Sequence, residues 1–456
     1  MRAKISALRG RLDESLFVDP PPAGPADQRA GKLLIIGGLF VLAVLLQMLR
    51  VGWSISLHSL WAEDGAVYLS GAVHSGFGGS LFDTYATYLV FVPRLIGELA
   101  GLVPLADAPI AISVLSAAVV ALSGWIVWEA TAGLIESPWL RGALVLLTVL
   151  VPVGGLESTD SAAYVPWYML FATFWILLWR PRTAGTAGGA GLFALLTGLS
   201  SPGVWFFIPL ALLRTVAARD RRDGLLLAGY WIGAMVQLPI LAFNNEEAVS
   251  PVWTHDIWTA YLQRVVDGAF LGLWIGGRAW RHFGWTLLIV LVVLLVAALI
   301  YGFWRSNLGA RLLALLAILI SLLMFVVSVY QRAVGEEMIW QPGQYVEAAG
   351  RYAIVPALLL FSVAAVMADR RSRRREGEAG ARWLAWPLAA LAIIVVAFSF
   401  RVASSEIRGT PPWEASLEHS AEVCESEPPG AETAVATSPP GWFLAIPCSD
   451  LAEYGR

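Results

Sequence analysis

Long apolar stretches alternate with short polar segments along most of this chain. Several stretches approach the roughly 20 residues that a helix needs to cross about 30 Å of hydrocarbon. The pattern therefore predicts an all-α polytopic membrane protein with about eleven transmembrane helices. The expected spans lie at 33–50, 108–131, 140–154, 163–179, 187–200, 202–217, 224–243, 283–304, 309–330, 351–368 and 383–400.

The segment 86–104 is also apolar, but Pro93, Arg94 and Glu98 interrupt it. An arginine at the centre of a membrane helix costs about 2.5–3.5 kcal/mol on insertion scales. If this segment does not span, the arginines at 180–182, 219–222 and 370–375 all face the cytoplasm, as the positive-inside rule requires. We therefore expect an interfacial helix at 86–104, within a large first extracytoplasmic loop.

This topology divides the chain into three parts of a plasma-membrane protein. We expect a cytoplasmic segment at 1–32, a transmembrane domain at 33–400 with its outer loop at 51–107, and an extracytoplasmic tail at 401–456. No small-residue cleavage site follows the first span, which favours a retained anchor. The Ser-Ser-Pro-Gly sequence at 200–203 is either a tight outer turn or a break in a helical hairpin at membrane depth.

The tail contains both cysteines of the chain, Cys424 and Cys448. Outside the cytoplasm a disulfide between them is favoured, and in the chain-entropy model it would stabilise the fold by about 3 kcal/mol. Two buried thiols are the alternative.

Composition agrees with a membrane protein and narrows the function. The chain is 57% hydrophobic and 14% charged, with a net charge of −3. Soluble proteins carry about 25% charged residues. No basic patch interleaved with aromatic residues points to nucleic acid. A Walker loop, a dinucleotide fingerprint and His/Cys metal spacing are likewise missing from the sequence, so no cofactor is assigned, and a divalent metal at paired carboxylates stays open.

The candidate chemistry consists of carboxylates and arginines on the expected outer face. Glu63 and Asp64 are adjacent in Trp-Ala-Glu-Asp-Gly, directly after the first span. Ionisable groups at the membrane edge are functional candidates, although the pair could simply begin a solvated loop. Carboxylates serve as general bases, and arginine binds phosphate through paired hydrogen bonds. Further candidates for substrate and donor binding are Arg94, Glu157, Asp160, Trp167, Arg264, Arg278, Arg281, Arg332, Arg351 and Tyr352.

Each single arginine has an alternative role as an interfacial anchor beside tryptophan. The segments nevertheless resemble the GT-C superfamily of integral-membrane glycosyltransferases. An acidic pair after the first span with a tyrosine four residues beyond Asp64 is typical of that superfamily. The similar segments are Tyr85 to Leu95, Glu157 with Tyr164, Pro166 and Trp167 (as in actinobacterial-type members), and Gly350-Arg351-Tyr352 with Pro356.

The resemblance implies an inverting transfer of sugar from a polyprenyl-phosphate donor to an envelope glycan, lipid or protein acceptor. It implies Asp64 as the general base, while Glu63 would orient the acceptor or hold a metal. The chain has Glu63-Asp64-Gly65 where many members have Asp-Glu-Ala, which leaves the choice of base open. A transporter or flippase of lipid-linked saccharide, or a non-catalytic scaffold of envelope assembly, are the alternatives.

Overall fold

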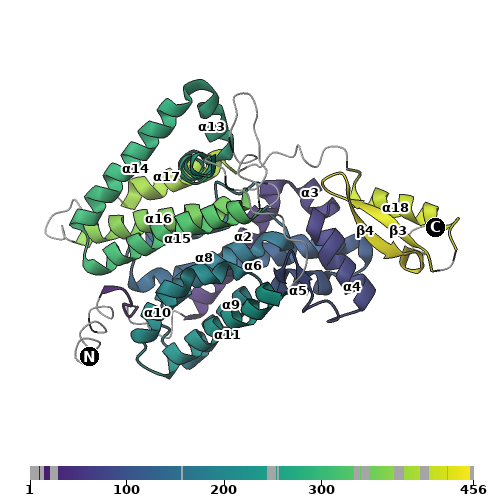
Figure 1. The fold of residues 1–456 in the computed structure, drawn as a ribbon, viewed down its shortest axis with the longest axis horizontal. Helices are drawn as coiled ribbons and strands as arrows, with labels where there is room; N and C mark the ends of the chain where they lie inside the picture. Colours follow the sequence, from purple (N-terminus) through teal and green to yellow (C-terminus); the bar gives the residue numbers. More distant parts are fainter. Residues whose placement is uncertain are drawn as a thin grey trace.

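The structure is a computed structural model in which the chain is largely helical. Figure 1 shows most of the long helices side by side, with α14 oblique to them and a small unit of one helix and one hairpin (α18, β3, β4) at one end. The structure describes residues 10, 15–20, 29–155, 158–243, 253, 256–332, 339, 350–373, 385–400, 410–428 and 430–451.

Every stretch that was expected to span the membrane forms a helix. Six helices among the described residues are long and apolar enough to cross a bilayer, which makes this a multi-pass membrane protein. The others are shorter apolar helices, so the expected number of eleven crossings is not confirmed. The long helices are α2 (Arg29–Val51), α6 (Ala108–Ala130), α11 (Arg221–Phe243), α14 (Trp285–Arg305), α15 (Leu308–Arg332) and α16 (Arg351–Arg373). The shorter ones are α7 (Pro138–Val149), α8 (Val165–Leu178), α9 (Ala184–Gly198), α10 (Ile208–Val216) and α17 (Ala385–Phe398).

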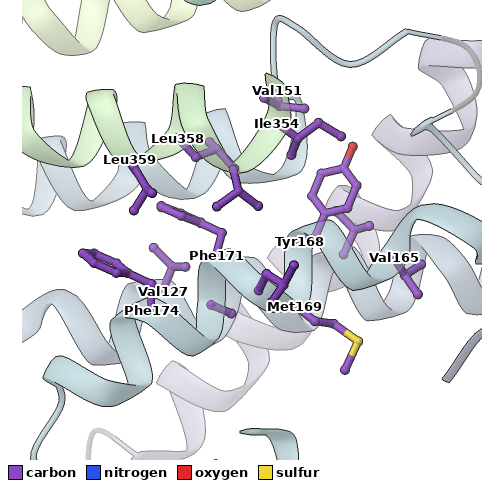
Figure 2. Close-up of a cluster of buried hydrophobic side chains, with 14 of the residues drawn as sticks. Val127, Val151, Val165, Tyr168, Met169, Phe171, Phe174, Ile354, Leu358 and Leu359 are labelled. Carbon is purple, nitrogen blue, oxygen red and sulfur yellow. The ribbon is translucent and has the colours of Figure 1, made fainter. Parts of the chain in front are cut away.

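The core is built around α8, in which every residue except Trp167 is buried. A helix that is apolar on all sides has to be surrounded by other helices or by lipid. Figure 2 shows Phe171 and Phe174 of α8 among Val127 of α6 and Leu358 of α16. Because α8 is packed on all sides, it holds the turn η6 (Ala162–Tyr164) at its N-terminus in a fixed position.

Helices α9 and α11 approach closely because glycines face each other. A Cβ on Gly229 would lie 1.9 Å from the carbonyl oxygen of Gly191, and one on Gly233 would lie 2.7 Å from that of Leu195. Small residues at such spacing allow membrane helices to pack backbone to backbone. The Ser-Ser-Pro-Gly turn after α9 leads into the short helix η7 (Pro202–Phe207). Phe91 N–H donates a hydrogen bond to Leu199 O, directly before this turn. The turn therefore lies beside the 51–107 segment.

A buried ion-pair network lies at the opposite end of α8. Asp223 accepts from Arg180 Nη1 at 2.7 Å and also from Arg214, and all three side chains are buried. Arg180 Nε donates to Phe17 O at 2.8 Å, and Phe17 is fully buried. Part of the expected polar N-terminal segment is thus packed into the bundle.

The first loop, 51–107, is folded rather than extended. The expected interfacial helix is a ten-residue helix, α5 (Phe91–Ala100), too short to cross a membrane and packed against η2 and α6. A hairpin of two strands precedes it, so the all-α expectation is wrong in detail. The elements are α3 (Trp53–His58), η2 (Asp64–Leu69), α4 (Ser70–Ser75), β1 (Thr84–Tyr85), β2 (Tyr88–Leu89) and η3 (Leu105–Asp107).

The tail forms a compact unit closed by a disulfide. Cys424 and Cys448 are bonded, with their Cα atoms 5.5 Å apart, which confirms the expected pairing. Alternating side chains make a second hairpin in which Val435, Leu444 and Ile446 are buried. The elements are α18 (Trp413–Cys424), β3 (Glu432–Thr437), β4 (Trp442–Pro447) and η11 (Cys448–Leu451).

Three further elements connect α11 to α14. They are α12 (Asp256–Ala260), the π-helical turn η8 (Tyr261–Asp267) and α13 (Gly268–Phe283), which is kinked at Gly272 with φ 69°. Tyr261 Oη lies 3.0 Å from Ser321 Oγ, which fixes η8 against α15.

Candidate functional site

The acidic pair opens the π-helical turn η2, and its two members have different surroundings. Asp64 is 1% exposed, whereas Glu63 is half-buried. Adjacent residues on a helical turn project in different directions. Two neighbouring carboxylates of similar chemistry therefore belong to two separate environments.

Asp64 is held by the short turn η6 (Ala162–Tyr164), which precedes α8. Its Oδ1 accepts a hydrogen bond from Ala163 N at 3.0 Å and one from Ser161 Oγ at 3.2 Å. Burial raises the pKa of Asp64 to about 8, while the bond from Ala163 acts in the opposite direction. The carboxyl is thus mainly protonated at neutral pH in this arrangement.

Asp64 and Asp160 both line a small cavity of about 30 Å³. Asp160 has φ 58° and accepts from Ser56 Oγ at 2.6 Å. Its Oδ1 is buried with no hydrogen-bond partner among the described residues. Burial raises the pKa of Asp160 to about 7, against the effects of Ser56 and Arg50. The cavity is large enough for about one or two water molecules and is polar enough to hold them.

Glu63 faces a second, partly open group of side chains. Tyr164 Oη lies 3.4 Å and 3.5 Å from its two carboxylate oxygens. Arg351 Nη1 donates to the same hydroxyl at 3.3 Å, and the guanidinium lies over the rings of Tyr164 and Tyr352. Tyr352 in turn meets Trp167 edge to face at 5.6 Å. Glu63, Arg351, Tyr352 and Trp167 were all candidates from sequence, and the structure brings them together.

The hairpin β1–β2 adds two tyrosines to this group, and the end of α15 adds a second arginine. Burial, and to a smaller extent the nearby charge of Glu63, raise the pKa of Tyr85 to about 12. Arg332 lies over the ring of Tyr88 at 5.8 Å and donates to Ala86 O at 3.2 Å. We call Glu63, Tyr85, Tyr88, Tyr164, Trp167, Arg332, Arg351 and Tyr352 the Glu63 cluster.

The turn of that hairpin is strained. Ala86 and Thr87 have φ of 52° and 80°, a region that favours glycine. Left-handed backbone costs about 1–2 kcal/mol for other residues. Gln237 holds the base of the hairpin, because its side-chain amide donates to Leu89 O at 2.9 Å and accepts from Leu89 N.

Arg94 has a different place from the one expected for a donor-binding residue. Its side chain is buried and donates to the carbonyl oxygens of Val67, Asp83 and Thr84 at 3.0–3.3 Å. It therefore ties η2 to the hairpin. Donor binding by Arg94 stays a prediction that these contacts do not support.

The other expected residues lie outside the Glu63 cluster or outside the described residues. Arg264 is fully buried in η8, the turn that ends at Asp267, whose pKa burial raises to about 7. Arg278 and Arg281 are exposed on α13. Glu157 falls outside the described residues.

Sequence reasoning missed the polar groups that hold the carboxylates. Ser161 and the backbone of Ala163 hold Asp64, yet no spacing connects them to a residue about 100 positions earlier. Tyr164 was noticed only as part of a family-like segment. Its proximity to a carboxylate follows from the packing of η6 on α5 and α6.

Chemically, the site combines a half-buried carboxylate, two arginines and several aromatic rings. A carboxylate can accept a proton, arginine can bind an anionic oxygen, and aromatic faces can pack against a sugar ring. Among the described residues, no group of three or more His, Cys, Asp or Glu side chains is placed to hold a metal ion.

Comparisons with known proteins add little to this geometry. No protein-family model and no curated protein matches the sequence. Among solved structures, an oligosaccharyltransferase from Archaeoglobus fulgidus, crystallised with zinc and sulfate, aligns with 85% of this chain at 15% identity and a TM-score of 0.38. This chain spans 55% of the length of that protein. A likeness of this size carries no argument about activity, which has to come from the site itself.

Proposed function

We propose that this protein is a membrane glycosyltransferase that moves a sugar from a polyprenyl-phosphate donor to an envelope glycan, lipid or protein on the outer side of the membrane. The observation that carries the proposal is the Glu63 cluster, where a half-buried carboxylate shares the hydroxyl of Tyr164 with Arg351. The chain resembles GT-C enzymes in the same segments.

Glu63 is the general base in this proposal. It removes the proton from an acceptor hydroxyl as that oxygen attacks the anomeric carbon of the donor sugar. The bond between that carbon and the phosphate oxygen breaks, and polyprenyl phosphate leaves with the electron pair. Asp64, the base expected from sequence, is buried with both hydrogen bonds directed at Oδ1. We assign it a supporting role that fixes η2 against η6.

Arg351 is proposed to bind the leaving phosphate. Arg351 is half-buried, and its Nη1 lies 3.3 Å from the hydroxyl of Tyr164, which also contacts Glu63. In this proposal the negative charge of the departing phosphate develops beside that guanidinium. Arg332 lies over the ring of Tyr88 and is the second phosphate candidate. Desolvated arginines that are preorganised around a developing anion lower the barrier more than they would in water.

The proposed transfer needs no metal ion. Asp64 and Asp160 line the small cavity, but the described residues supply no third carboxylate there.

The test is transfer of labelled sugar from a polyprenyl-phosphate donor to acceptors in membranes that contain matched amounts of protein variants. Arg351→Ala should weaken donor binding, and Arg351→Lys should restore it only in part, because a point charge cannot replace the planar fork. Arg221→Ala, at the exposed start of α11, is the matched control.

The same samples separate the alternatives. A flippase would move the intact labelled lipid between leaflets without forming a glycosylated product, and a scaffold would do neither. Either result, with the protein present and folded, would overturn the proposal.

A further inference from the structure

The C-terminal unit contacts the backbone that leads directly into Glu63. Ser438 N donates to Leu60 O at 2.8 Å, and Ala62 N donates to Ser438 O at 2.5 Å. Ser438 thus pairs with Trp61 as a parallel bridge. Figure 1 shows the unit beside α3 and α4, at the same end of the bundle. Two hydrogen bonds from the tail therefore fix the backbone one residue before the candidate base.

A second contact lies one turn further along the acidic segment. Gly65 follows Asp64, and a Cβ placed on it would lie 2.6 Å from Cγ2 of Thr437. This distance is too short for two carbon atoms. Gly65 is therefore required by the close approach of β3 and not by its own backbone conformation, which is helical.

The unit is anchored at three other points of the first loop. Trp413, 1% exposed, donates through Nε1 to Leu105 O at 2.8 Å. His58 Nδ1 lies 2.5 Å from Glu414, and His74 Nε2 lies 3.4 Å from Glu432. The disulfide joins α18 to the end of β4, so these anchors belong to one covalently closed unit.

We propose that residues 410–451 act as a positioning device for the catalytic carboxylate, with Ser438 and Thr437 as the positioning residues. The inference rests on the proposed function of Glu63. An error of about 1 Å in the placement of a reacting group can cost about 10²-fold in rate. The tail holds the 60–65 backbone where Glu63 meets Tyr164, the residue that Arg351 also contacts, and transfer depends on the closed disulfide.

The first experiment introduces a steric clash between residues 65 and 437 and then removes it with a second substitution. Gly65→Ala puts a methyl group against Thr437, and Thr437→Ser removes the methyl that it would meet. We expect Gly65→Ala to lower the turnover of sugar transfer by about tenfold to a hundredfold, with donor KM largely kept. The turnover of the double variant Gly65→Ala with Thr437→Ser should return to within a few-fold of the turnover of Thr437→Ser alone.

Gly142→Ala in α7 is the matched control, because no atom lies within 4 Å of its added Cβ. Alanine favours a helix over glycine by about 1 kcal/mol, so helix propensity alone would not lower activity in either variant. A Gly65→Ala variant as active as wild type, or one that Thr437→Ser fails to rescue, would overturn the proposal.

The second experiment needs no activity. Amide hydrogen exchange of residues 60–69 is followed in the intact protein before and after the disulfide is reduced, and in Cys424→Ser. We expect exchange at Ala62 and Gly65 to accelerate together with that of residues 430–451. Faster exchange in the tail with no change at 60–69 would show that the tail does not hold the segment. Coupled exchange in a protein that transfers no sugar would overturn the proposed function while supporting the mechanical link.

Discussion

At the residue scale, the two adjacent carboxylates of the candidate site have different surroundings: Asp64 is buried and Glu63 is half-buried. Sequence placed Glu63 and Asp64 at the centre of the chemistry, and it named Arg351, Tyr352 and Trp167 beside them. It could not say which carboxylate is exposed, because burial comes from Ser161 and Ala163, about 100 positions away. Partners that distant are fixed only by the packing of whole helices.

The burial of Asp64 makes a prediction about stability. Its pKa rises from 3.8 to about 8 on folding, so the folded protein binds the proton more tightly than the unfolded chain. Stability from this group is complete below pH 3.8 and is lost as pH rises through about 8. Asp64→Asn cannot ionise and keeps an acceptor oxygen. Asp64→Asn should therefore have a higher melting temperature than wild type at pH 8. Its melting temperature should also fall less between pH 5 and pH 8.

Thermal unfolding in detergent at several pH values provides the measurement. Asp83→Asn, at an exposed carboxyl in the same loop, is the control and should change neither quantity. Equal pH dependence in wild type and Asp64→Asn would show that Asp64 is ionised in the folded protein.

At the element scale, apolar length predicted the helices well and the hairpins not at all. Each expected span coincides with a helix to within a few residues, since a long apolar run in a membrane has no other way to satisfy its backbone. The strands of β1–β2 have two residues each, too few for an alternating pattern. Their turn also uses Ala86 and Thr87 where turn rules call for glycine or asparagine.

The disulfide-closed unit leads to the second prediction. Cys424→Ser, Cys448→Ser and the double variant should destabilise the tail equally, by about 3 kcal/mol in the chain-entropy model, because each removes the same bridge. Urea-induced exposure of Trp413, which is buried in the unit, is a suitable signal. Thiol titration of the unfolded wild type without reductant should find no free thiol. Two reactive thiols, or unequal single variants, would contradict the bridge.

At the scale of the whole molecule, the two ends of the bundle carry different sets of ionisable groups. The Glu63 cluster and the C-terminal unit lie at one end, while Arg180, Arg214 and their partner Asp223 lie at the other end of α8 and α10. The positive-inside rule applied to sequence assigns the arginine end to the cytoplasm. Which side each end faces stays a prediction, and so does the number of crossings made by the shorter helices.

Cysteine accessibility in intact cells tests that orientation. Ser75→Cys, exposed at the end of α4, should react with an impermeant thiol reagent, and Ala184→Cys, exposed at the start of α9, should react only after lysis. Both positions lie outside the Glu63 cluster, so protein levels should match wild type. Labelling of Ala184→Cys in intact cells would reverse the orientation and place Glu63 in the cytoplasm.

The central claim is that Glu63 accepts the proton during sugar transfer. Turnover with a labelled polyprenyl-phosphate sugar, compared between wild type, Glu63→Gln and Asp64→Asn at matched protein levels, tests it most directly. General-base catalysis contributes about 10²–10⁴-fold, so Glu63→Gln should lose turnover by that factor while binding of the donor is kept. Asp64→Asn should lose less turnover than Glu63→Gln. Wild-type turnover in Glu63→Gln together with its loss in Asp64→Asn would reassign the base to Asp64, and wild-type turnover in both would contradict a catalytic role for the acidic pair.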